Sequence, residues 1–138
     1  MIALDASTLI DVLFGTARAE ASAAAVRSAL QVGPVVICDV VVAELAGRGN
    51  SQAIMDSVKE LGIQYSMLEE RTAMRAGEMS NRFRVRQRQR GLALRERITP
   101  DFLVGAHALL QCQGLVTHDG GFHRDYFKGL KVIVPGEA

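Results

Sequence analysis

Short apolar runs alternate along the chain with longer segments of helical periodicity. Continuous apolar runs are typical of strands buried on both faces of a parallel sheet. Such runs predict strands over residues 1–5, 35–38, 63–68, 115–119 and 131–135. Amphipathic or alanine- and leucine-rich segments predict helices over residues 7–14, 18–31, 40–47, 51–62, 69 to about 90, and 100–114. This alternation predicts an α/β domain with a mostly parallel sheet.

Capping residues and helix breakers set the expected boundaries of these elements. We expect Ser7 to cap the first helix and Asp39 to cap the helix over residues 40–47. The valines that open that second helix weaken its prediction, because β-branched residues favour strands. Gly91 ends the long polar helix, and the HDGG sequence at 118–121 predicts a turn after the fourth strand.

Length and composition indicate one globular domain over residues 1–138. Hydrophobic residues make up 49% and aromatic residues only 5%, so the core should be mainly aliphatic. No apolar stretch approaches the roughly 18 residues that span a bilayer. The first residues, MIALDASTLID, lack the basic start of a signal peptide, so we expect a cytoplasmic protein with no membrane partner. Cys38 and Cys112 are expected to be reduced.

The formal net charge of +1 conceals a strongly basic segment. Residues 82–97, RFRVRQRQRGLALRER, contain seven Arg and one Glu, which leaves nine basic and 14 acidic residues elsewhere. On a helix, the arginines at alternate positions fall into two rows, Arg82, Arg86, Arg90 and Arg84, Arg88. We expect them to contact nucleic-acid phosphates. The alternatives are a solvated helix paired with Glu69, Glu70 and Glu78, or contact with an acidic stretch of a partner protein.

Four acidic residues stand after predicted strands or near helix starts. Asp5 and Asp119 end strands, Glu44 lies just beyond the second strand, and Asp101 begins a helix. Parallel strands end at one edge of a sheet, where ligand sites lie, so these side chains should meet there. Clustered carboxylates raise one another's pKa, and a cation removes that cost. Ligation by oxygen alone suits Mg²⁺ or Mn²⁺, which can neutralise a phosphodiester and lower the pKa of water.

Each acid also has a purely structural interpretation. Asp5 and Asp119 fit turns at strand ends, and Glu44 fits a solvated helix face. Asp101 follows Thr99 and Pro100, which begin the helix, so it can simply complement the helix dipole. The positive end of that helix would also keep Asp101 ionised, as a metal ligand must be, so the two interpretations are compatible.

Histidines and aromatic residues leave further alternatives open. His107, His118 and His123 are expected to form hydrogen bonds, because their spacing supplies too few partners for zinc. The aromatic side chains near the C-terminus are suited either to stacking on bases or to packing a terminal turn against the core; they are Phe122, Tyr126 and Phe127.

The combined motifs resemble those of PIN-domain ribonucleases, and more narrowly VapC, the toxin of VapBC toxin–antitoxin pairs. The resemblance rests on IALDASTLIDVL, VVVAELAG, ITPDFLVGAHAL and LVTHDGGFHRDYF, in family order over nearly the whole chain. It implies a three-layer α/β/α domain with a mostly parallel central sheet. It also implies Mg²⁺- or Mn²⁺-dependent RNA cleavage, a homodimer, and inhibition by a cognate VapB-like antitoxin. The family's acids would be Asp5, Glu44, Asp101 and Asp119.

Two departures from the family pattern are mild. The family often has Asp-Thr-Asn at the first acid, whereas this chain has DAS, in which Ser7 can still donate a hydrogen bond. The last motif commonly reads Thr-Arg-Asp, and His118 here replaces a permanent cation with one that titrates. Thr117 is placed either to orient a carboxylate or to serve as an ordinary strand residue.

These motifs favour a nuclease mechanism over two alternatives. Asp5 and Asp101 would hold one cation directly, with Glu44 and Asp119 completing the site through waters or a second cation. A non-catalytic PIN-fold module that binds RNA or protein would be expected to lack one of the acids. An aspartyl phosphatase would need a second Asp where this chain has Ser7.

Overall fold

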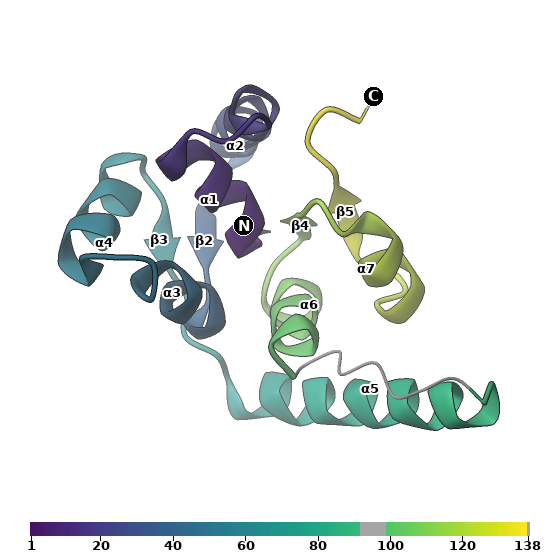
Figure 1. Ribbon diagram of the computed structural model, residues 1–138. Coiled ribbons are helices and arrows are strands. Elements are labelled where there is room, and N and C mark those ends of the chain that lie inside the picture. The colour runs from purple at the N-terminus through teal and green to yellow at the C-terminus, as the bar shows by residue number, and fades with distance from the viewer. Residues whose placement is uncertain (92–98, 138) are drawn as a thin grey trace.

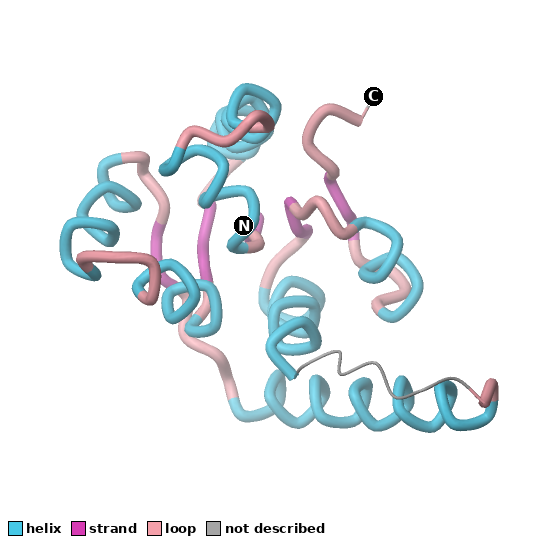
Figure 2. Tube along the Cα trace, in the orientation of Figure 1, coloured by secondary structure: helices cyan, strands magenta, loops and turns pink. Residues whose placement is uncertain are grey.

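Five short parallel strands form the centre of the molecule. The computed structural model describes residues 1–91 and 99–137. The strands are β1 (Ile2–Leu4), β2 (Val35–Ile37), β3 (Gln64–Tyr65), β4 (Gly114–Val116) and β5 (Lys131–Ile133). They lie in the order β3-β2-β1-β4-β5, and every neighbouring pair is parallel. The first strand of the chain is therefore the central one, as the position of the N-terminus shows (Figure 2).

The helices pack around this sheet and give the predicted three-layer α/β/α arrangement, which confirms the expected fold class (Figure 1). They are α1 (Ala6–Phe14), α2 (Ala19–Val32), α3 (Asp39–Ala46), α4 (Ser51–Glu60), α5 (Glu70–Gln89), α6 (Thr99–Gln111) and α7 (Gly120–Tyr126). Helix α6 contacts β1 and β4 on one side and α5 on the other, so the long α5 helix is held away from the sheet.

Two hydrophobic clusters stabilise different parts of the fold. The larger one is aliphatic and surrounds the sheet, with the β2 residues Val35 and Ile37 fully buried. The smaller one is aromatic and joins α5, α6 and the end of α7 through Phe83, Phe102 and Phe127. Gly105 of α6 permits this contact, because a Cβ there would lie 2.3 Å from the Phe127 ring. The aromatic cluster thus fixes the helix that carries Asp101 against the segment that follows Asp119.

Several predicted boundaries are wrong. Asp5, not Ser7, is the N-cap of α1, and it accepts a 2.8 Å hydrogen bond from the Ala6 N–H. Asp39 is the first residue of α3 and does not cap it, because its side chain accepts from the Leu68 N–H instead. The Asp39 prediction failed because its side chain accepts from a donor that is distant in sequence, and the Ser7 prediction failed because the helix begins earlier, at Ala6.

The third and fourth strands are shorter than predicted, and a helix replaces the predicted turn. Strand β4 ends at Val116, so Asp119 lies three residues beyond it and precedes α7 directly. Cys38 and Cys112 are both free, as expected. No helix in the described ranges 1–91 and 99–137 is both long and apolar enough to cross a membrane.

Candidate active site

The carboxyl ends of β1 and β4 bring Asp5 beside the segment from Thr117 to Asp119. Leu4 pairs with Val116 in the parallel register. The Asp5 N–H then donates to the Val116 carbonyl at 2.9 Å, which extends the pairing one residue beyond β1. Asp5 and Asp119 therefore belong to the same edge of the sheet, although 113 residues of the chain separate them.

Thr117 joins these two acids through one buried hydroxyl. Its Oγ1 donates to Asp5 Oδ2 at 2.8 Å and accepts from the Asp119 N–H at 3.0 Å. The Thr117 side chain is fully buried, so this hydroxyl has no competing contact with bulk water. Because Asp5 Oδ1 already accepts from the Ala6 N–H, both oxygens of Asp5 are oriented. Groups of this kind hold ligands in position around metal ions.

Glu44 and Asp101 approach Asp5 from α3 and α6. Glu44 is exposed as a residue, yet its pKa is raised, first by partial loss of water around the carboxylate and then by the negative charges of Asp5 and Asp101. Arg48 opposes this effect. The fold therefore brings the carboxylates of Asp5, Glu44 and Asp101 close enough to repel one another, and this repulsion contributes to the raised pKa of Glu44.

The donor chemistry of this site fits a hard divalent cation. All four predicted ligands offer carboxylate oxygens, which Mg²⁺ and Mn²⁺ prefer. The raised pKa of Glu44 is the electrostatic cost that such a cation removes. In the described part of the chain, no three His, Cys, Asp or Glu side chains already form a metal site.

The arginine row predicted from the sequence lies on the second half of α5. The solvated-helix alternative paired these arginines with Glu69, Glu70 and Glu78. Within the described residues, however, Glu69 pairs with Arg71 and Glu78 pairs with Arg75. Arg86 is half-buried, whereas the other predicted RNA-binding residues are exposed: Arg82, Arg84, Arg88 and Arg90. Residues 92–97 of the basic segment lie outside the described residues.

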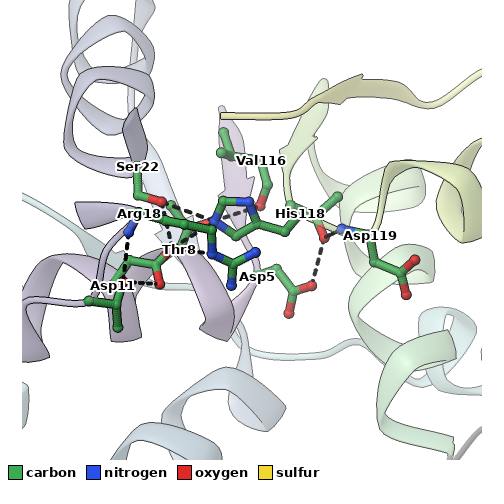
Figure 3. A network of polar contacts seen from close by, with 10 residues as sticks. Asp5, Thr8, Asp11, Arg18, Ser22, Val116, His118 and Asp119 are labelled. Atoms are coloured by element: carbon green, nitrogen blue, oxygen red, sulfur yellow. Dashed lines mark hydrogen bonds and ion pairs between the residues drawn. The ribbon is translucent and has the colours of Figure 1, made fainter. Parts of the chain in front are cut away.

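The three histidines form hydrogen bonds. His107 is buried beside Ser66, with Nε2 2.9 Å from Oγ, and burial lowers its pKa. His123 Nδ1 donates to the Asp119 carbonyl at 2.9 Å, which ties the start of α7 to its own first turn. His118 points the other way, toward α1 and α2 (Figure 3).

His118 contacts Asp11, a buried acid that the sequence analysis missed. Asp11 of α1 is 2% exposed, and its Oδ2 lies 2.6 Å from His118 Nε2. The Asp11 carboxylate also accepts from the Thr16 and Ser22 hydroxyls at 2.6 and 2.7 Å. Burial acts to raise the pKa of Asp11, but these hydrogen bonds and the charge of Arg18 lower it overall. The signal was an Asp within the apolar run TLIDVLF.

This network links the α1–α2 hairpin to the loop that carries Thr117 and Asp119. Figure 3 shows Asp11, Ser22 and His118 on one side, with the Asp5 and Asp119 carboxylates apart from them. Asp11 thus has no direct contact with the candidate site. Asp11 instead holds His118, which lies in the sequence between Thr117 and Asp119, two residues of the candidate site.

A PIN domain family model matches residues 2–128 of the chain. The chain belongs to the PIN domain family. No curated protein gives a significant match to it.

Solved structures similar to this PIN domain come from several bacterial complexes. VapBC2 from Rickettsia felis, bound to a promoter DNA fragment, matches with a TM-score of 0.65 and 15% identity over 97% of this chain and 98% of that one. VapBC-1 from nontypeable Haemophilus influenzae matches with a TM-score of 0.66 and 17% identity, over 99% of this chain and 100% of that one. FitAcB from Neisseria gonorrhoeae matches with a TM-score of 0.62 and 20% identity, over 100% of both chains. At these identities the matches support the fold of the PIN domain.

Proposed function

We propose that this PIN domain is a single-domain endoribonuclease that requires Mg²⁺ or Mn²⁺ and acts as the toxin of a toxin–antitoxin pair. The observation that carries the proposal is the convergence of acids at one edge of the sheet. Thr117 joins Asp5 to the backbone of Asp119, and Asp5 and Asp101 both act on Glu44. All four acids of the resemblance are present in the chain.

The proposed reaction is hydrolysis of an RNA phosphodiester. Asp5 and Asp101 would hold the cation directly, with Glu44 and Asp119 around them. When bound, the cation supplies positive charge against the phosphate and makes water easier to deprotonate. A carboxylate of the set accepts a proton from the attacking water, whose oxygen bonds to phosphorus. The bond from phosphorus to the 3′ oxygen breaks, and that oxygen gains a proton, leaving a 5′-phosphate and a 3′-hydroxyl.

A protein partner is part of this proposal. The similar structures are toxin–antitoxin complexes, by name VapBC from two bacteria and a toxin–antitoxin complex from Klebsiella pneumoniae. We infer a cognate VapB-like antitoxin that binds this chain and silences it, and a homodimer as the working form.

Cleavage of total cellular RNA by the purified protein tests the proposal. We expect cleavage with Mg²⁺ or Mn²⁺, none with EDTA, and none from Asp101→Asn with metal present. Asp56→Asn is the matched control, because Asp56 is an exposed aspartate that accepts a 2.9 Å hydrogen bond from the Gln52 side chain of its own helix. Circular dichroism checks that each variant is folded.

Two outcomes separate the nuclease from a binding module of the same fold. Cleavage that persists in EDTA and in Asp101→Asn would contradict the proposed site. Absence of cleavage calls for expression in cells. Toxicity that Asp101→Asn removes supports a nuclease with a narrow RNA target, and absence of toxicity supports a binding module.

A further inference from the structure

The inward face of α5 changes from apolar to basic along its length. Its buried residues recur at helical spacing and end in the aromatic cluster; they are Thr72, Ala76, Met79, Ser80 and Phe83. An amphipathic helix normally keeps its charged residues on the opposite, solvated face. Arg86 and Arg90 instead continue the buried row, one and two turns beyond Phe83. Arg86 is half-buried in this row, so its position requires an explanation other than solvation.

Both arginines border a cavity beside the candidate active site. The cavity has a volume of about 260 Å³, and its lining includes Arg86, Arg90, Asp119, Phe122, Asp125 and Tyr126. Asp119 thus lies between the Asp5 side of the candidate site and this cavity. It is tied to Asp5 through Thr117 on one side and borders this cavity on the other.

Tyr126 holds Arg86 at the cavity. The Arg86 guanidinium carbon lies 5.1 Å from the centre of the Tyr126 ring, within the range of a cation–π contact. Phe83 and Phe102 pack edgewise or tilted against the Tyr126 ring and the cluster around it, which fixes the ring in place. A ring contact orients the charge of Arg86 without neutralising it. The charge is therefore directed into the cavity and remains available to an anion.

We propose that Arg86 and Arg90 form a phosphate subsite for single-stranded RNA next to the carboxylates, with Tyr126 as the positioning residue for Arg86. The subsite rests on the proposed function, since it binds the strand whose neighbouring phosphate is cleaved. Arginines interleaved with aromatic rings are typical of surfaces that bind single strands. Asp119 and Asp125 limit affinity for free phosphate, so the subsite acts on an RNA chain that other contacts also hold.

The two arginine rows of α5 supply a matched comparison. Arg86 and Arg90 border the cavity, whereas Arg84 and Arg88, which are exposed like Arg90, are not among its described lining residues. Arg82, the third member of the inward row, donates to the Met79 sulfur at 3.8 Å. Replacing either pair with alanine removes the same charge from the same helix, so any difference reports on position alone.

Binding of a fluorescent single-stranded RNA in EDTA, titrated with salt, tests the subsite without cleavage. Each phosphate contact to a single strand contributes roughly 0.7 to the slope of log affinity against log salt. We expect the Arg86→Ala, Arg90→Ala variant to lose roughly 1.4 from that slope. The Arg84→Ala, Arg88→Ala variant should lose less than that, and an Arg27→Ala, Lys59→Ala control, which removes two exposed cations from α2 and α4, should keep the wild-type slope. Equal losses from both pairs, or no loss from either, would overturn the proposal.

Substitution of Tyr126 tests the positioning role. Tyr126→Phe keeps a ring under Arg86 and should bind RNA like wild type. Tyr126→Leu keeps the net charge but removes the ring, and we expect its affinity and salt slope to approach those of an Arg86→Ala variant. Thermal unfolding identifies any general loss of structure in Tyr126→Leu. A folded Tyr126→Leu variant with wild-type binding would remove Tyr126 from the proposal.

Cleavage assays on the same variants separate this proposal from the nuclease proposal. Metal-dependent cleavage with the same KM in the Arg86, Arg90 variant and wild type would overturn the subsite and leave the nuclease intact. RNA binding that depends on Arg86, with neither cleavage by any sample nor toxicity in cells, would support the subsite and count against the nuclease.

Discussion

Asp11 and Glu44 are carboxylates in opposite circumstances. Asp11 is almost fully buried, and its pKa is nevertheless lowered, because hydroxyls, His118 and the charge of Arg18 outweigh the effect of burial. Glu44 is exposed as a residue, and its pKa is raised by partial desolvation and by two neighbouring acids. The extent of burial alone therefore does not determine the direction of the pKa shift. The hydrogen-bond donors and charges around each carboxylate also contribute.

The difference assigns the two acids to different tasks. A buried carboxylate with several donors is a structural link, and removing it leaves those donors unsatisfied. Carboxylates that repel one another destabilise the folded chain unless something positive binds between them. Asp11 therefore fits a role in the scaffold, whereas Glu44 fits the metal site that we propose.

The largest expected effect is on catalysis by Glu44→Gln. If Glu44 helps hold the cation, its loss removes several kcal/mol of transition-state stabilisation, which corresponds to about a 1000-fold slower cleavage. Single-turnover cleavage of an RNA substrate measures this rate. A Glu60→Gln variant, on an exposed end of α4, is the control and should cleave at the wild-type rate. Equal rates for both variants would remove Glu44 from the site.

The next effect is on stability and concerns Asp11→Ala. Removing a buried carboxylate that accepts several hydrogen bonds costs about 3 kcal/mol of the free energy of unfolding, because its donors lose their acceptor. Urea unfolding measures this loss. Glu44→Gln, which removes a repelled charge, should be at least as stable as wild type in EDTA. The comparison between the two acids breaks down if Glu44→Gln is the less stable variant.

Thr117→Val tests the link between the two acids. The substitution keeps the shape but removes the hydroxyl, so Asp5 loses a donor and the Asp119 N–H loses its acceptor. We expect cleavage or metal affinity to fall about 10- to 100-fold, as for other residues that orient ligands. Thr117→Ser, which restores a hydroxyl, should recover most of the activity. Full activity of Thr117→Val would show that orientation of Asp5 has another source.

The smallest expected effect is the pH dependence that Asp11 contributes to stability. Its folded pKa lies below the ordinary value of 3.8. Its contribution is therefore fully present above that value and is lost as pH falls through the folded pKa. Urea unfolding at a series of pH values should show less acid destabilisation in Asp11→Asn than in wild type. Identical pH profiles would mean that the Asp11 hydrogen bonds do not favour its charged form.

Much of the fold was predictable because buried parallel strands have a simple signature. The runs that contain Ile2–Leu4, Val35–Ile37 and Gly114–Val116 are apolar, and the acid that follows a parallel strand must lie at one edge. That rule placed Asp5 and the Asp119 loop together. The spacing of side chains within the site was not predictable, because it depends on how α3 and α6 pack.

Two features were missed for reasons that concern distant partners. Helix α7 begins with Gly120 and Gly121, which locally favour a turn. A Cβ at Gly120 would lie 2.7 Å from the Val134 side chain, so the glycine there reflects close packing. Asp11 was overlooked because its partner His118 is 107 residues away in sequence. Neither constraint is visible in a local pattern.

The central position of β1 has a consequence for synthesis of the chain on the ribosome. Strand β1 is made first, but it pairs with β4, which is made more than a hundred residues later. The Asp5 carboxylate therefore cannot receive its hydrogen bond from Thr117 until the segment that carries Thr117 and Asp119 has left the exit tunnel. Under the proposed nuclease function, the order of strands would therefore place a delay between translation of the acids and assembly of the site, and that delay would need no partner protein.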